Sequence, residues 1–166
     1  FVMAIRLAIN GFGRIGRMVT RVAATSGSGV RLVAINDLMD LKTMAHLLRY
    51  DSVPGRYPGE VHTVNENLQI DGRDVEVFSE PNPEKLPWAA LNVDVVLESS
   101  GRFRRAGEAK KHLDAGATRV IVTAPAQVDA TVVMGVNDSI LRPDHQLISA
   151  ASCTTNCLAP VVKVLH

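Results

Sequence analysis

Residues 149–158 carry the clearest chemistry in the sequence, and Cys153 stands among them. Residues 144–150 are typical of a short strand, and residues 158–166 place apolar side chains at helical spacing. We therefore predict Cys153 at a strand-to-helix junction, where the first-turn N–H groups are unpaired and the helix dipole is positive. Both effects favour the thiolate, which is the nucleophilic form of cysteine.

The hydroxyl groups beside Cys153 have two expected roles. Ser152 or Thr154 can cap the predicted helix. As substrate-binding groups, both hydroxyls and the backbone N–H of Cys153 would hold an oxyanion that develops on the substrate.

An inert thiol is the alternative interpretation of Cys153, because most free cysteines behave as small buried apolar residues. Cys157, one helical turn further on, is expected to be buried and inert in this way. The sequence has only two cysteines, so a metal site lacks ligands, and a disulfide within one helical turn would distort the backbone. We therefore expect no metal.

A glycine-rich segment near the amino terminus, residues 11–16, fits the pattern G-x-G-x-x-G. It follows a predicted strand at residues 5–9 and opens a predicted helix at residues 14–25, whose apolar side chains recur at helical spacing. Asp37 comes 21 residues after Gly16, at the end of the next predicted strand, residues 30–36. This context is the fingerprint of a dinucleotide-binding site.

Each glycine of the fingerprint has its own expected role. Gly11 permits a tight turn, Gly13 lets backbone N–H groups reach the pyrophosphate, and Gly16 lets the helix pack closely on the strand. Asp37 is expected to accept hydrogen bonds from the adenosine ribose, and its charge would repel a 2′-phosphate, which favours NAD over NADP. Capping the helix that follows is an alternative role for Asp37.

Several segments together resemble one known family. Residues 151–160, Ala-Ser-Cys-Thr-Thr-Asn-Cys-Leu-Ala-Pro, are similar to the active-site segment of the phosphorylating glyceraldehyde-3-phosphate dehydrogenases. The likeness runs from Ile5 to the end of the chain and includes residues 9–17, 34–38, 48–53, 97–101 and 131–138. It covers the cofactor-binding part of that family and leaves out its catalytic domain.

The resemblance implies an activity and a set of site residues. Cys153 would attack glyceraldehyde 3-phosphate, NAD would take a hydride, and inorganic phosphate would release 1,3-bisphosphoglycerate, the glycolytic reaction of a cytoplasmic homotetramer. Ser100 replaces a common Thr, Pro81 a usual Arg or Lys, and Ala150 a usual Asn. With the fingerprint, the resemblance gives these cofactor-binding residues: Asn10, Gly11, Phe12, Gly13, Arg14, Ile15, Gly16, Asn36, Asp37, Pro81, Ser100, Gly101 and Thr123.

The elements that must position these residues alternate between strand and helix. Helices are also expected at 38–49 and 105–115, and strands at 61–64, 67–70, 75–78, 93–97, 120–123, 132–134 and 147–149. The predicted fold class is therefore α/β, a Rossmann-type doubly wound and mostly parallel sheet with a small antiparallel insert. We expect residues 3–150 to form an NAD-binding domain and residues 151–166 to begin a truncated catalytic domain, whose apolar helix face needs a partner surface.

Composition excludes some kinds of partner. With 18 basic and 17 acidic residues the formal net charge is +1, so neither nucleic acid nor membrane binding is indicated. The basic residues at 102–111 are interpreted as a solvated helix face. No apolar run approaches the roughly 20 residues of a membrane span. Residues 1–5 are interpreted as part of a first strand, not a signal peptide, and the few cysteines then indicate a reducing, cytoplasmic setting.

None of the five histidines fits the general base that such a thiol needs. His166 lies about 20 Å along the helix from Cys153, and His145 is expected at the far end of the strand before it. The resemblance places the base in a following domain, so we expect this chain to bind NAD without turnover on its own. Erythrose-4-phosphate dehydrogenase and a non-catalytic NAD-binding or scaffolding module are the alternatives.

Overall fold

The computed structural model describes residues 4–166. Residues 1–3, which the sequence analysis assigned to the first strand, lie outside the described residues. Its helices and strands follow one another in the order that the sequence predicts. The strands are β1 (Ile5–Asn10), β2 (Val30–Asn36), β3 (Val61–Val64), β4 (Asn67–Ile70), β5 (Arg73–Phe78), β6 (Val95–Glu98), β7 (Arg119–Val122), β8 (Ala130–Thr131) and β9 (Leu147–Ser149). The helices are α1 (Arg14–Thr25), α2 (Leu41–Arg49), α3 (Ala106–Asp114) and α4 (Cys153–Leu165).

Within residues 4–166 the strands form one nine-stranded sheet in the order β3-β4-β5-β2-β1-β6-β7-β9-β8. All pairs from β5 to β8 across the sheet are parallel, and β3, β4 and β5 pair antiparallel at one edge. The chain builds outward from β1 through β2 and then returns to β6 on the other side of β1. This reversal is the switch point of a doubly wound fold, so the predicted fold class and its antiparallel insert are confirmed.

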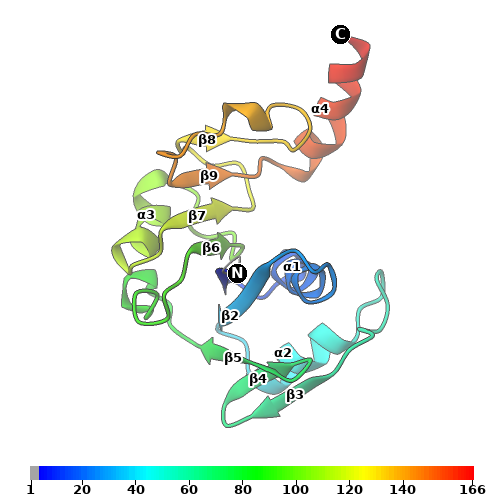
Figure 1. Cartoon of the computed structure of the whole chain (residues 1–166), viewed down its shortest axis with the longest axis vertical. Helices are drawn as coiled ribbons and strands as arrows, with labels where there is room; N and C mark the ends of the chain where they lie inside the picture. Colours follow the sequence, from blue (N-terminus) through cyan, green and yellow to red (C-terminus); the bar gives the residue numbers. More distant parts are fainter. Residues whose placement is uncertain (1–3) are drawn as a thin grey trace.

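Helices cover opposite faces of the sheet, as Figure 1 shows for α1 and α2 on one side and α3 on the other. The side chains of β1 alternate between the two faces. Ile9 joins a buried cluster with Met44 and Leu48 of α2, whereas Ala8 joins a second cluster with Trp88 and others under α3. Because both faces of the sheet are buried, the central strands consist mostly of apolar residues.

Three predicted elements differ from the structure. The second helix begins at Leu41 instead of residue 38, because Asp40 caps it by accepting a hydrogen bond from the Thr43 N–H. The strand predicted at residues 132–134 is wrong, since β8 ends at Thr131. Asn137 folds the chain back there by accepting from the Val133 N–H and donating to the Thr131 carbonyl. The last helix starts at Cys153, five residues before the apolar pattern begins.

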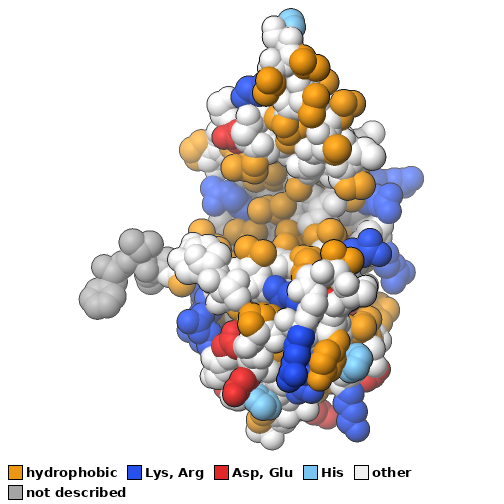
Figure 2. Space-filling view, turned by 90° about the vertical axis from the view of Figure 1, so that its right-hand side faces the viewer, with side chains coloured by type: hydrophobic (Ala, Val, Ile, Leu, Met, Phe, Trp, Pro, Cys, Tyr) orange, Lys and Arg blue, Asp and Glu red, His pale blue; other side chains and the backbone are white. Residues whose placement is uncertain are grey.

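Helix α4 extends away from the sheet and ends at the carboxyl terminus (Figure 1). Its apolar side chains Leu158, Val161, Val162 and Leu165 are more than half exposed, and Figure 2 shows such side chains gathered around this end of the molecule. Cys157 is also exposed, so the expectation that it is buried is wrong for this chain. None of the helices in residues 4–166 is long and apolar enough to cross a membrane.

Candidate functional site

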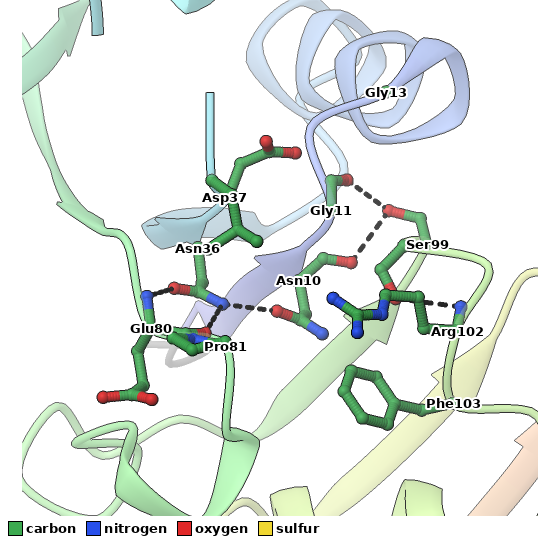
Figure 3. A pocket seen from close by; sticks show the side chains of 12 residues that line it. Asn10, Gly11, Gly13, Asn36, Asp37, Glu80, Pro81, Ser99, Arg102 and Phe103 are labelled. Carbon is green, nitrogen blue, oxygen red and sulfur yellow. Dashed lines mark hydrogen bonds between the residues drawn. The ribbon is translucent and has the colours of Figure 1, made fainter. Parts of the chain in front are cut away.

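A pocket of about 240 Å³ opens at the carboxyl ends of β1, β2 and β6, beside the switch point of the sheet. Ligands of open α/β sheets bind at this position. Four segments line the pocket, as Figure 3 shows, and each directly follows or ends a strand. The lining residues are Asn10, Gly11, Gly13, Asn36, Asp37, Leu38, Glu80, Pro81, Ser99, Ser100, Arg102 and Phe103.

In the glycine-rich loop, Gly11 and Gly16 are tightly packed and Gly13 has open space beside it. A Cβ atom on Gly11, whose φ is +96°, would lie 2.3 Å from the Ser100 nitrogen, and one on Gly16 would lie 2.4 Å from the Gly11 oxygen. A Cβ on Gly13 would meet nothing within 4 Å. Gly13 also caps α1 without a side-chain hydrogen bond. The start of α1 therefore faces the pocket with bare backbone, which fits a pyrophosphate group.

Asp37 is held in place by two backbone groups. One carboxylate oxygen accepts a hydrogen bond of 2.6 Å from the Phe12 N–H, and the other accepts one of 2.9 Å from the Met39 N–H. These bonds tie the end of β2 to the glycine-rich loop. Each oxygen keeps a further lone pair, which suits an acceptor for ribose hydroxyls. The alternative role of Asp37 as the cap of α2 is wrong, because Asp40 fills it.

The floor of the pocket is formed by two asparagines at the ends of neighbouring strands. Asn36 donates to the Asn10 side-chain oxygen at 2.7 Å and to the Glu80 carbonyl at 2.9 Å, while its own oxygen accepts from the Glu80 N–H at 2.8 Å (Figure 3). Both asparagines are buried. The segment after β5, which continues into Pro81, is thus fixed against the end of β2.

The turn after β6 closes the other side of the pocket. The Ser99 hydroxyl donates to the Gly11 carbonyl at 2.6 Å, which holds this turn against the glycine-rich loop. The Ser100 hydroxyl donates to the Glu98 carboxylate and accepts from the Arg102 N–H at 3.2 Å. Gly101 takes a φ of +76°, and the Thr123 hydroxyl at the end of β7 donates to the Glu98 carbonyl at 3.3 Å.

The structure brings most of the predicted cofactor residues together and leaves others outside the lining. The pocket is lined by Asn10, Gly11, Gly13, Asn36, Asp37, Pro81 and Ser100 but not by Phe12, Arg14, Ile15, Gly16, Gly101 or Thr123. The Phe12 side chain is fully buried, whereas Arg14 and Ile15 line a separate opening that includes Tyr50. Five lining residues were not predicted, namely Leu38, Glu80, Ser99, Arg102 and Phe103. Their signal in the sequence is that they follow strand ends.

The thiol lies at the start of α4, on the same edge of the sheet as the pocket. Ser152 is the helix cap, since its hydroxyl accepts from the Thr155 N–H at 3.0 Å, and Cys153 is the first helical residue. Ala151 before it has a φ of +60°, which is strained for alanine. Thr154 lines a groove with Leu158 and Val162. Cys153 is exposed, and residues 4–166 contain no cluster of His, Cys, Asp or Glu that would bind a metal.

A model of the glyceraldehyde 3-phosphate dehydrogenase NAD-binding domain family matches residues 5–106 of this sequence. The chain belongs to this family. Its fold, the glycine-rich loop and the pocket are accordingly those of an NAD-binding domain of oxidoreductases, and its cofactor is NAD.

Full-length relatives named glyceraldehyde-3-phosphate dehydrogenase resemble the chain throughout. The protein of Thermotoga maritima is 55% identical over 163 residues, which are 97% of this chain and 49% of the relative. That of Geobacillus stearothermophilus is 53% identical over 166 residues, 99% of this chain and 49% of the relative. That of Pseudomonas aeruginosa is 53% identical over 167 residues, with 99% and 50% covered. The chain thus spans about half the length of the curated relatives it matches.

Proposed function

We propose that NAD lies along the carboxyl-terminal edge of the sheet, with its adenosine at Asp37 and its pyrophosphate at Gly13. Its nicotinamide would extend past the end of β7, where Thr123 stands, toward Cys153. The order of the strands supports this proposal, because β2, β1, β6, β7 and β9 are consecutive neighbours and end at one edge. Four steps of about 4.8 Å separate β2 from β9, roughly 19 Å in all. The proposal rests on this arrangement, in which Asp37, Thr123 and Cys153 follow strands that end at one edge of the sheet.

We further propose that Cys153 is the nucleophile of a phosphorylating aldehyde dehydrogenase acting on glyceraldehyde 3-phosphate. Its thiolate would add to the aldehyde carbon to form a thiohemiacetal, whose oxyanion the Cys153 N–H and the hydroxyls of Ser152 and Thr154 would hold. Bound NAD supplies the acceptor for the hydride that leaves this carbon. The resulting thioester on Cys153 is then cleaved by inorganic phosphate, which takes the acyl group and returns the thiolate.

The chain supplies the cofactor site and the thiol in this proposal, but not the base. His112 is buried against Glu98 and Trp88, and the His145 ring nitrogen accepts from the Arg142 N–H. No hydrogen bond joins a histidine to Cys153 within the described part of the chain. We therefore propose that residues 3–150 form the NAD-binding domain and that residues 151–166 begin a catalytic domain, which supplies the base in a cytoplasmic homotetramer.

Calorimetric titration of the 166-residue chain with NAD and with NADP tests the cofactor site. We expect NAD to bind at least tenfold more tightly, because a 2′-phosphate would meet the Asp37 carboxylate. Equal affinity for the two cofactors, or no binding of NAD, would contradict the proposed placement. In the same preparation we expect no NADH production from glyceraldehyde 3-phosphate, and measurable turnover would refute the proposed division of roles.

Erythrose-4-phosphate dehydrogenase remains the alternative enzyme, and a non-catalytic NAD-binding or scaffolding module the alternative of another class. Comparative rates of the whole protein on the two phosphorylated aldehydes separate the two enzymes. Reactivity of Cys153 separates an enzyme from a module, because a module has no need of an activated thiol.

A further inference from the structure

A chain of buried polar side chains runs under the floor of the pocket into the interior of the protein. Asn36, Asn10 and Glu98 end the adjacent strands β2, β1 and β6 and are register partners, so their side chains lie on one face of the sheet. Asn10 donates to Glu98 Oε2 at 2.5 Å, and His112 Nε2 lies 2.9 Å from the same oxygen. The Trp88 indole donates to His112 Nδ1 at 3.0 Å. All five residues are buried.

The direction of each hydrogen bond in this network follows from the groups at its two ends, whose donor or acceptor roles are fixed. An indole N–H can only donate, so His112 Nδ1 is the acceptor and the ring proton stands on Nε2, which donates to Glu98. At the other end, the backbone N–H and carbonyl of Glu80 fix the Asn36 amide, which donates to the Asn10 oxygen. The Asn10 NH₂ group must then face Glu98. His112 is therefore neutral and holds one defined tautomer.

Glu98 is the point where the network meets the pocket. Besides Asn10 and His112, its carboxylate accepts from the N–H and the hydroxyl of Ser100. All four of these groups can donate, so the site fits the carboxylate form of Glu98, which only accepts. Within the described residues it forms no salt bridge with lysine or arginine. The buried charge is thus stabilised by these four hydrogen bonds, and loss of one donor leaves it undersatisfied.

His112 reaches the pocket by two routes although it does not line it. Through Glu98 it fixes the Asn10 amide in the floor and Ser100 in the turn after β6. Its ring also packs edge-on against Phe103, with centroids 6.3 Å apart and planes at 87°. Phe103 and Ser100 both line the pocket. One buried histidine therefore contacts, directly or through one carboxylate, the floor, the turn and one aromatic wall.

We propose that His112 is a positioning residue for NAD binding, with Trp88 selecting its tautomer. The proposal rests on the placement of NAD in this pocket. Removing the Nε2 donor leaves Glu98 to compete for the remaining donors, so the Asn10 amide and the Ser100 turn lose their fixed orientation. A role in stability alone would lower the melting temperature without changing how well the folded chain binds NAD.

Two substitutions separate positioning from stability. His112→Leu keeps an apolar side chain and removes the donor, whereas His112→Gln retains an N–H that can donate to Glu98. We expect His112→Leu to raise the NAD Kd about tenfold, the effect of losing one hydrogen bond to a charged group, and His112→Gln to stay within about threefold. His46→Leu, which removes an exposed histidine of α2, is the matched control and should leave Kd unchanged. A Kd for His112→Leu within twofold of the unaltered chain would overturn the proposal.

Nitrogen NMR of the imidazole tests the network without any cofactor. At pH 7 we expect the proton of His112 on Nε2 alone in the unaltered chain, and exchange between tautomers in Trp88→Phe. A proton on Nδ1, or on both nitrogens, in the unaltered chain would overturn the proposal. If the His112 proton is on Nε2 but the unaltered chain does not bind NAD, both the proposed cofactor site and the positioning role of His112 are refuted. Loss of binding in His112→Leu only would leave both standing.

Discussion

The Asp37 carboxylate accepts a hydrogen bond of 2.6 Å from the backbone N–H of Phe12, a residue 25 positions earlier in the chain. This bond joins the end of β2 to the loop that begins α1, and a second bond from Met39 fixes the carboxylate from its other side. The group proposed to bind ribose is therefore held in place before any ligand arrives. Such preorganisation reduces the ordering that binding would otherwise require.

Asp37→Ala should weaken both cofactor binding and folding. We expect the NAD Kd to rise at least tenfold and the free energy of unfolding to fall by about 1–3 kcal/mol, because two backbone N–H groups lose their acceptor. Asp40→Ala is the control, since it removes the cap of α2 outside the pocket. It should lower Tm by about 2–4 °C and leave Kd unchanged. Titration calorimetry and thermal unfolding measure the two effects, and equal Kd values for the two variants would contradict the role of Asp37.

Gly13→Ala should weaken NAD binding and leave stability nearly unchanged, which is the opposite of the effect expected for Asp40→Ala. A methyl group at this position meets no protein atom within 4 Å but stands at the start of α1, where the pyrophosphate is proposed to lie. We expect a rise in the NAD Kd of more than tenfold with a loss of at most about 1 kcal/mol in unfolding free energy, because Gly13 is the helix cap. Denaturant unfolding and fluorescence titration measure these, and an unchanged Kd would place the pyrophosphate elsewhere.

Gly16→Ala provides the contrasting variant in the same loop. Its methyl group would lie 2.4 Å from the Gly11 carbonyl oxygen, so the backbone of the glycine-rich loop or of α1 must move. Overpacking of this kind costs about 1–3 kcal/mol. We expect a lower urea midpoint than for Gly13→Ala. A midpoint equal to that of the unaltered chain would mean that helix and strand are not in close contact here.

The segment from β1 to β2 could be predicted from the sequence to within a residue. A buried strand, a glycine turn, an amphipathic helix and a Ser-Gly-rich stop follow one another, and each of these signals is local. The start of α2 could not be predicted in this way. Both Asp37 and Asp40 are suitable helix caps by residue type, and only the contact with Phe12, distant in sequence, decides that Asp40 takes the role.

The walls of the pocket were harder to predict than its glycine-rich loop. Glu80 and Phe103 come from connections that follow β5 and β6, and no motif marks them. The network below them was not predicted either, because Asn10 and Glu98 are 88 residues apart and meet only through the register of β1 with β6. From the sequence, His112 is one of five histidines that do not fit the general base, and its link to the pocket depends on strand pairing that periodicity does not reveal.

Cys153 should react faster than Cys157 with iodoacetate at pH 7. Both thiols are exposed, so accessibility does not distinguish them. Cys153 is the first residue of α4 and lies at the positive end of the helix dipole, whereas Cys157 lies one turn inside it. We expect a rate ratio of at least ten, measured by mass spectrometry on Cys153→Ser and Cys157→Ser variants. Equal and slow alkylation of both would favour the non-catalytic module.

The strand that leads to Cys153 should depend on Asp129 in a pH-dependent way. Hydrogen bonds from the Leu147 and Gln146 N–H groups, at the start of β9, hold the pKa of the Asp129 carboxyl below its ordinary value of 3.8. A lowered folded-state pKa stabilises the fold above pH 3.8, and this contribution is lost as the pH falls through the folded-state pKa. Asp129→Ala should therefore lower the urea midpoint at pH 7, and its difference from the unaltered chain should shrink below about pH 4.

Asp144→Ala, which removes an exposed partner of Arg142, is the control, and its free energy of unfolding should differ from that of the unaltered chain by less than about 0.5 kcal/mol at pH 7. A difference for Asp129→Ala that is constant from pH 7 to pH 3 would show that the charge of this carboxylate does not stabilise β9.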